Sequence, residues 1–189
     1  MSNKLLIIGA GGHGRSVAEA VLAANLFEIA GFVDDNASVD IFGFPVLGIT
    51  ADLALLTDTA SHVIVAIGNN ALRQQLCQQV LSLGFQLATV VHPKAIVSPS
   101  AVIDDGVTIM AGAIVGTEAK LGVGVIVNCG AVVDHHAKVE DFGHLGVNAC
   151  MAAESVLGTG AWMQAGSSLG YGVTIASNQV LLPGQGIGS

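Results

Sequence analysis

An apolar residue falls on every sixth position from Val97 almost to the end of this 189-residue chain. The series comprises Val97, Ile103, Ile109, Val115, Leu121, Val127, Val133, Val139, Leu145, Met151, Leu157, Met163, Leu169, Ile175, Leu181 and Ile187. A small residue follows many of them four positions later, as at Ala113, Ala119 and Ala131. A period of six matches neither an α-helix, which repeats every ~3.6 residues, nor an isolated strand, which repeats every ~2.

This repeat predicts a parallel β-helix built of short strands. Each repeat forms one flat face whose apolar residue points into the coil, and three faces close a coil, so about five coils are expected. Small residues are needed at the corners, where bulky side chains would collide with the next coil. A β-sandwich would instead show turn signals every ~8–12 residues, so the unbroken register disfavours it. Seven glycines suit the tight turns: Gly106, Gly112, Gly116, Gly122, Gly124, Gly130 and Gly158.

The first part of the chain begins with the pattern of a strand, a glycine turn and a helix. The stretch KLLIIG at 4–9 predicts a buried strand, and its last glycine begins the sequence GAGGHG at 9–14. Apolar residues at helical spacing then predict a helix over 15–24. In this context, bare backbone N–H groups at a helix N-terminus can hold a phosphate.

A second predicted strand, 29–33, ends at Asp34 and Asp35, where a carboxylate could reach a ribose hydroxyl. This spacing leaves a nicotinamide dinucleotide open as a ligand. The region is short for that purpose, however, because it has room for only about four strands.

Two more strands and a helix complete the expected α/β region. Residues 62–68 predict a third buried strand and 86–91 a fourth, and Asn70 is predicted to N-cap a helix that ends near Leu83. Strands that alternate with helices predict a parallel sheet with its ligand-binding turns at the carboxyl ends of the strands.

Several candidate ligand-binding residues fall at these strand ends. They are Gly11, Gly12, His13, Asp34, Asp35, Gly68 and Asn69. We therefore expect a Rossmann-like nucleotide-binding domain over 1–92, followed by a β-helix domain over 93–189.

Charge and composition exclude several function classes. The formal net charge is −8 and the six Lys and Arg residues are scattered, whereas a nucleic-acid surface needs a clustered basic patch. No apolar run approaches the length of a membrane span, and the run 5–8 is too short for a signal-peptide core, so we expect a cytoplasmic protein. Cys77, Cys129 and Cys150 lack metal or redox spacing. We expect no metal, and we expect Cys129 and Cys150 to be reduced thiols in or near the coil core.

The polar and ionisable residues of the predicted β-helix that could take part in catalysis are concentrated in the stretch 128–144. They are Asn128, Asp134, His135, His136 and His144. All five avoid the inward positions of the repeat, so they are predicted to face outward. Different faces of one coil would separate them, whereas coils packed side by side in an oligomer would bring them together.

Together these motifs resemble the bacterial sugar O- and N-acyltransferase family. The matching stretches are 9–14 (GAGGHG), Asp34-Asp35, 66–70 (AIGNN), 91–93 (VHP), the six-residue repeats, Asn128, Asp134-His135 and 142–144 (FGH). The resemblance covers nearly the whole chain. The family includes the PglD-like N-acetyltransferases of bacillosamine synthesis, which act on nucleotide-linked 4-amino sugars, and the NeuD-like sialic acid O-acetyltransferases.

The resemblance implies a homotrimer of left-handed β-helices with active sites between subunits. The N-terminal domain would bind a UDP-sugar, with Gly11, Gly12 and His13 near the diphosphate. Asp34 and Asp35 would lie near the nucleoside.

The resemblance also assigns roles within the coils, where acetyl-CoA would lie. His135 matches the catalytic base, His144 the histidine near the thioester, and Asn128 a sugar-side contact. Gly143 and the stretch from Ala161 to Gly166 fall along the acetyl-CoA groove of the family. Members usually carry an acidic residue directly after the catalytic histidine. That position is His136 in this chain, so either His136 or Asp134 would orient the base.

Acetyl transfer to an amine needs little beyond these groups. The free amine attacks the thioester carbonyl, an imidazole can accept the proton, and a backbone N–H or His144 can stabilise the oxyanion. We therefore expect an acetyl-CoA-dependent N-acetyltransferase that acts on a UDP-linked 4-amino-4,6-dideoxy sugar, in bacterial glycan or glycoprotein biosynthesis. Two alternatives stay open: O-acetylation of a sialic acid, and a non-catalytic β-helix scaffold that binds a nucleotide sugar.

Overall fold

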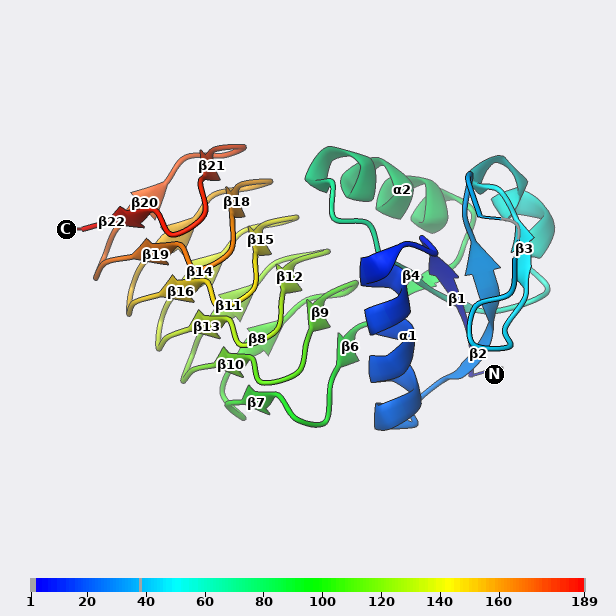
Figure 1. The fold of residues 1–189 in the computed structure, drawn as a ribbon, viewed down its shortest axis with the longest axis horizontal. Helices are drawn as coiled ribbons and strands as arrows, with labels where there is room; N and C mark the ends of the chain where they lie inside the picture. Colours follow the sequence, from blue (N-terminus) through cyan, green and yellow to red (C-terminus); the bar gives the residue numbers. More distant parts are fainter. Residues whose placement is uncertain (1–2, 38, 189) are drawn as a thin grey trace.

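The computed structural model describes residues 3–37 and 39–188. It contains an α/β region followed by a parallel β-helix, whose last strand lies farthest from the α/β region (Figure 1). The α/β elements are β1 (Lys4–Ile8), α1 (Gly12–Ala24), β2 (Glu28–Val33), β3 (Val46–Gly48), the 3-10 helix η1 (Thr50–Leu56), β4 (His62–Val65), α2 (Asn70–Ser82) and β5 (Gln86–Leu87). This order confirms the predicted fold class.

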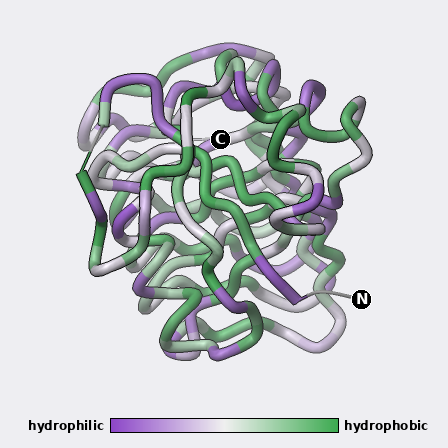
Figure 2. Tube along the Cα trace, turned by 90° about the vertical axis from the view of Figure 1, so that its right-hand side faces the viewer, coloured by the Kyte–Doolittle hydropathy of each residue, from purple (hydrophilic) through white to green (hydrophobic). Residues whose placement is uncertain are grey.

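The α/β region is built on a parallel sheet in the order β3-β2-β1-β4-β5. Along β1, Leu5 and Ile7 pack in the cluster that contains α1, while Leu6 and Ile8 pack in the cluster that contains α2. Both faces of the sheet are therefore covered, which explains why its strands are continuous apolar runs. Viewed from this end, hydrophobic segments run through the interior, and hydrophilic segments gather in the outer loops (Figure 2).

The expected strand over 86–91 is in fact two strands. β5 pairs with β4 at the edge of the sheet, whereas β6 (Val90–Val91) pairs with β9 (Thr108–Ile109) of the β-helix. The chain leaves the sheet between them, and helix α1 lies between the sheet and β6 (Figure 1).

The β-helix consists of two-residue strands, one in each six-residue repeat. After β6 they are β7 (Ile96–Val97), β8 (Val102–Ile103), β9 (Thr108–Ile109), β10 (Ile114–Val115), β11 (Lys120–Leu121), β12 (Ile126–Val127), β13 (Val132–Val133), β14 (Lys138–Val139), β15 (His144–Leu145), β16 (Cys150–Met151), β17 (Val156–Leu157), β18 (Trp162–Met163), β19 (Ser168–Leu169), β20 (Thr174–Ile175), β21 (Val180–Leu181) and β22 (Gly186–Ile187). Every third strand pairs in parallel, which gives the sheets β22-β19-β16-β13-β10-β7, β20-β17-β14-β11-β8 and β21-β18-β15-β12-β9-β6.

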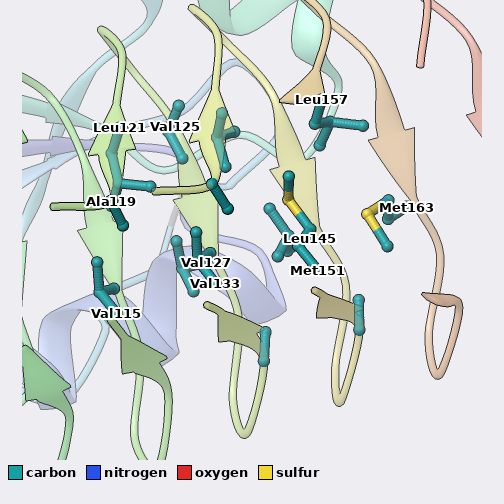
Figure 3. Close-up of a cluster of buried hydrophobic side chains, with 14 of the residues drawn as sticks. Val115, Ala119, Leu121, Val125, Val127, Val133, Leu145, Met151, Leu157 and Met163 are labelled. Carbon is teal, nitrogen blue, oxygen red and sulfur yellow. The ribbon is translucent and has the colours of Figure 1, made fainter. Parts of the chain in front are cut away.

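The second residue of most of these strands points into the coil. Leu121, Val127 and Leu145 are buried with their equivalents in one continuous core (Figure 3). The six-residue repeat thus correctly predicted the inward positions. Cys150 takes an outward position on β16 and is exposed, so its expected place in or near the core was wrong.

The glycines predicted at tight turns fall into two groups. Positive φ angles, between +64° and +75°, occur at Gly106, Gly112, Gly124 and Gly130. Gly116, Gly122 and Gly158 have no such angle, and instead lie where coils approach closely. A Cβ added to Gly158 would lie 2.6 Å from the backbone nitrogen of Ser177. Lack of space, rather than turn geometry, therefore requires glycine at these three positions.

Within the described ranges, no helix is both long and apolar enough to cross a lipid bilayer.

Candidate active site

The N-terminal part of α2 joins the α/β region to the β-helix. Asn70 Nδ2 donates a hydrogen bond to the carbonyl oxygen of Gly160 (2.8 Å). The N-cap of α2 is Asn69, not Asn70 as predicted, because the side chain of Asn69 accepts the N–H of Leu72 (3.0 Å). Asn70 is thereby left free to bridge the two parts of the chain, along a contact that we call the seam.

Arg73, one helical turn further along α2, is enclosed in the seam with only 1% of its surface exposed. Its Nε donates to the carbonyl of Gly124 (2.7 Å) and its Nη2 to the carbonyl of Phe142 (2.7 Å), both in the β-helix. Its Nη1 donates to the carbonyl of Ile67 (2.9 Å). Burial lowers the pKa of Arg73 to about 10, so the side chain remains a buried cation at neutral pH.

His144 points from β15 into the seam, toward the buried arginine. Its ring stacks on Trp162 of the neighbouring strand β18, with centroids 5.4 Å apart and planes 16° apart. The residue faces out of the coil as the repeat predicts, yet only 7% of it is exposed. An outward position in a β-helix is ordinarily a surface position, but the α/β region covers this one.

Burial keeps two histidines of the seam neutral. Burial first, then the charge of Arg73 and repulsion from His13 when that ring is protonated, lower the pKa of His144 to about 3, although a hydrogen bond with the Gly68 backbone opposes the shift. Burial and then Arg73 lower the pKa of His13, at the start of α1, to about 4. Both rings can therefore take part in hydrogen bonds without carrying charge at neutral pH.

Three buried ring nitrogens near the seam have no hydrogen-bond partner in the described part of the chain. They are Nε2 of His13, Nδ1 of His144 and Nε1 of Trp162. Buried polar atoms are nearly always satisfied in folded proteins. Unpaired atoms gathered in this way fit a site that a polar ligand completes.

A cavity of about 430 Å³ opens beside two of these rings. It is lined by Gly68, Asn69, Asn70, Ala71, His144, Gly160, Trp162, Asn178 and Val180. The turn after β4 and the start of α2 form one wall, and the outward residues of β15, β18 and β21 form the other. The structure thus brings the predicted residues Gly68, Asn69 and His144 together, in a space typical of small-molecule sites.

A second cavity, of about 290 Å³, lies at the carboxyl edge of the sheet and is lined in part by Gly9, Asp34 and Asp35. Burial acts to raise the pKa of Asp34, but hydrogen bonds from three backbone N–H groups, including that of Ala10 (2.7 Å), bring it below its ordinary value. Asp35 accepts the N–H of Thr50 (2.7 Å). Both carboxylates therefore hold loops beside the cavity in place.

The glycine turn before α1 leaves room at the start of the helix. A Cβ added to Gly11 or Gly12 would meet nothing within 4 Å, so the backbone there is open to a ligand. A Cβ on Gly14 would instead lie 1.8 Å from the carbonyl oxygen of Gly9, so helix and strand pack too closely for any side chain.

His135 lies outside the seam cavity, in the corner between β13 and β14. The carboxylate of Asp134 accepts the backbone N–H of His135 (2.7 Å). The His135 ring instead meets the ring of His136, with their Nδ1 atoms 2.9 Å apart. On its other side, Nε2 of His136 lies 3.2 Å from Oε2 of Glu118.

The remaining predicted residues are spread along the coils. Asn128, in the corner after β12, accepts the N–H of Cys129 (2.8 Å). Gly143 is buried, and Gly166 is an exposed turn glycine with a φ angle of +68°. Ala161 is fully buried in the coil interior, so only its backbone can face a ligand.

Three residues of these sites were not singled out from the sequence: Arg73, Glu118 and Trp162. Trp162 stacks on His144 from the next coil, three repeats later, and Glu118 lies three repeats before His136. Because one coil is three repeats, a search at that spacing from each histidine could have found both. Arg73 has no such signal, since its partners depend on how the helix meets the coils.

The α/β region and the parallel β-helix that follows it define a hexapeptide-repeat protein. Residues 4–80 match the family model of the PglD N-terminal domain. A solved structure of a mutant perosamine N-acetyltransferase from Caulobacter crescentus, in complex with CoA and GDP-perosamine, is 33% identical and has a TM-score of 0.88, and the match covers 97% of this chain and 90% of that one.

Two further relatives extend the comparison. The acetyltransferase domain of PglB from Neisseria gonorrhoeae FA1090, in complex with acetyl coenzyme A, is 36% identical with a TM-score of 0.79, and the match covers 100% of this chain and 97% of that one. UDP-N-acetylbacillosamine N-acetyltransferase of Bacillus subtilis (strain 168) is 36% identical over 111 residues, which are 56% of this chain and 50% of that protein. The match thus spans half the length of this curated relative. The chain belongs to the PglD-like family of sugar acyltransferases.

Proposed function

We propose that this protein transfers the acetyl group of acetyl-CoA to the amine of a nucleotide-linked 4-amino-4,6-dideoxy sugar in glycan or glycoprotein biosynthesis. The observation that carries the proposal is the seam cavity, which neutral His144 and Trp162 line together with the turn at Gly68. A relative with this fold binds CoA together with GDP-perosamine. Similarity to UDP-N-acetylbacillosamine N-acetyltransferase favours UDP as the nucleotide.

The two parts of the chain divide the substrates between them in this proposal. Residues 1–92 bind the nucleotide sugar, with Gly11, Gly12 and His13 toward the diphosphate, because open backbone N–H groups at a helix N-terminus favour an anion. The cavity beside Asp34 and Asp35 takes the nucleoside. Residues 93–189 hold acetyl-CoA.

Other predicted residues keep their proposed roles at the reacting end of the substrates. Gly68 and Asn69, which line the seam cavity, contact the sugar. Asn128 lies outside the lining of that cavity and contacts the sugar from the β-helix. Gly143, Gly166 and the backbone of Ala161 lie along the acetyl-CoA groove.

The two histidines have different tasks in the reaction. The sugar amine attacks the acetyl carbonyl, a C–N bond forms, the C–S bond breaks, and CoA leaves as its thiolate. A group with a pKa of about 3 is a weak base at neutral pH, so His144 serves as an uncharged hydrogen-bond partner. The amine proton goes to exposed His135.

His135 lies outside the seam cavity of its own chain. In the proposed homotrimer, one chain therefore supplies His135 to the seam cavity of the next chain. The protein is proposed to act in the cytoplasm. Exposed apolar side chains on the β7 sheet, Ile96 and Ile114, support side-by-side packing of coils. Mixing inactive His135→Ala and His144→Ala chains tests the arrangement. Co-assembled chains should regain activity, whereas a site within one chain would stay inactive.

The reaction is tested by measuring thiol release from acetyl-CoA with UDP-, dTDP- and GDP-linked 4-amino sugars and with free sialic acid. We expect release with one nucleotide sugar. His135→Ala should lower it roughly 10²-fold or more without weakening CoA binding. Nucleotide-sugar binding without release for any substrate would overturn the proposal and favour a scaffold.

A further inference from the structure

We infer that Glu118 is a positioning residue for His135 and that it acts through His136. The three side chains form a line at one corner of the β-helix, which we call the corner relay. Its role in catalysis rests on the proposed acetyl transfer with His135 as the base.

The coil repeat itself builds the corner relay. Glu118, His136 and Glu154 occupy the same corner position in three successive coils, and all three have left-handed backbones, with φ angles of +55°, +59° and +59°. Backbone hydrogen bonds connect the corners, from His136 N to the carbonyl of Thr117 (2.9 Å) and from Glu154 N to the carbonyl of His135 (3.2 Å). The His136 ring therefore has a glutamate in the coil on either side.

Only one of the two glutamates is paired with His136. Oε2 of Glu118 lies 3.2 Å from Nε2 of His136. Glu154 instead accepts a hydrogen bond from Tyr171 in the following coil. Asp134 is occupied by the backbone N–H of His135. Among these neighbouring acids, Glu118 is thus the one whose carboxylate contacts a ring of the His135–His136 pair in the described part of the chain.

The hydrogen-bonding capacities of the three groups determine which nitrogen of each histidine ring carries hydrogen. An ionised carboxylate only accepts, so Nε2 of His136 carries a hydrogen. A neutral His136 then has a lone pair on Nδ1, which accepts the Nδ1–H of His135 across 2.9 Å. Nε2 of His135 consequently keeps its lone pair, which is what a general base needs.

The same line stabilises the protonated base. When Nε2 of His135 takes the proton of the attacking amine, the ring becomes an imidazolium that still donates from Nδ1 to His136. The carboxylate of Glu118 lies at the far edge of the His136 ring and compensates the positive charge through it. No atom beyond the amine proton needs to move.

Histidine tautomers in the free protein test the corner relay without any substrate. ¹⁵N NMR should find His135 with hydrogen on Nδ1 and His136 with hydrogen on Nε2. Glu118→Ala should mix the two tautomers of both rings, whereas Glu154→Ala, the same change one coil away, should leave them as they are. A His135 that carries hydrogen on Nε2 in the unaltered protein would overturn the inference.

Kinetics then test the consequence for the base. Glu118→Ala should lower kcat roughly tenfold with KM unchanged for both substrates, and Glu118→Gln, which keeps an acceptor oxygen, should recover part of the loss. In a His136→Phe background Glu118→Ala should have no further effect. An equal loss in Glu154→Ala would point to general damage of the corner and contradict the inference. If no substrate reacts, the proposed function fails, while the NMR result still decides the positioning.

Discussion

The seam and the corner relay each hold a histidine that faces out of the same β-helix, but they place it in opposite surroundings. At the seam, the α/β region covers His144, and Arg73 beside it is 1% exposed. In the corner relay, the side chains of His136 and Glu118 are 52% and 61% exposed. The repeat sets the direction of a side chain, whereas the packing of the rest of the molecule determines whether water reaches it.

This difference in exposure determines how much each set of polar contacts contributes to the free energy of unfolding. Hydrogen bonds made by a buried charge are strong, and removing the charge leaves their acceptors without partners. Exposed ion pairs contribute little to the free energy of unfolding. We therefore expect substitution of the buried cation Arg73 to act mainly on folding and substitutions in the corner relay to act mainly on turnover.

The largest effect should come from Arg73→Met, which keeps the length of the side chain and removes the charge. It leaves the carbonyls of Gly124 and Phe142 unpaired at the seam, and should lower the free energy of unfolding by about 3–5 kcal/mol. Urea denaturation of this variant, with Gln78→Met on the exposed side of α2 as the control, measures it. A loss no larger than that of the control would show that the seam does not depend on the buried cation.

Lowering the pH should destabilise the protein through the two neutral histidines of the seam. In the unfolded chain a histidine binds a proton near pH 6.5, whereas the folded pKa values are about 3 for His144 and about 4 for His13. The unfolded state therefore takes up protons first as the pH falls. Stability from these two groups is complete above pH 6.5 and is lost as the pH falls, by about 1.4 kcal/mol per pH unit for each ring, down to about pH 4 for His13 and about pH 3 for His144.

Carboxylates also change the stability of the protein as the pH falls, so variants of each histidine are needed to measure the part that comes from the histidine rings. Between pH 6 and pH 4.5, His144→Gln should show a shallower loss of unfolding free energy than the unaltered protein, by about 2 kcal/mol over the interval. His13→Gln should behave in the same way. Parallel curves for the variants and the unaltered protein would mean that the seam does not exclude protons from these rings.

Asn70→Ala should have a smaller effect at the same contact. It removes the hydrogen bond to the carbonyl of Gly160 and the one that Asn70 Oδ1 accepts from Nη2 of Arg73 (2.9 Å), and should lower the free energy of unfolding by about 2 kcal/mol. Since Asn70 also lines the seam cavity, KM for the nucleotide sugar should rise, while Gln74→Ala, on an exposed part of α2, should leave both quantities unchanged. Loss of stability with an unaltered KM would separate the seam from the substrate site.

The fold was largely predictable because its main signal is local. A repeat of six determines which residues of each short strand enter the coil, and the burial of Leu121 and Val127 follows from the sequence alone. The strand over 86–91 was predicted as one because β5 and β6 have only two residues each and lie two residues apart in the sequence. Their partners, β4 and β9, decide that they belong to different sheets.

The candidate site was only partly predictable, because its geometry depends on contacts between distant segments. The strand ends correctly placed Gly68 and Asn69 at one edge of the sheet. Neither the burial of His144 nor the role of Arg73 could be inferred, since both arise where α2 meets coils that follow much later in the chain. The pairing of His136 with Glu118 was predictable in principle, because the two residues lie three repeats apart and three repeats make one coil.

The smallest change in the free energy of unfolding is expected for Glu118→Ala in the corner relay, in contrast to the large change expected at the seam. Glu118→Ala removes one exposed hydrogen bond between a carboxylate and the His136 ring, and should change the free energy of unfolding by less than about 0.5 kcal/mol, because water competes for both exposed groups. Urea denaturation at low and high salt, with Glu154→Ala alongside, measures it. A variant that keeps its stability but loses turnover can have lost only the orientation of the base or the charge that stabilises it. A loss of several kcal/mol would instead make Glu118 a structural residue of the coil, and the slower turnover would then follow from a disturbed corner.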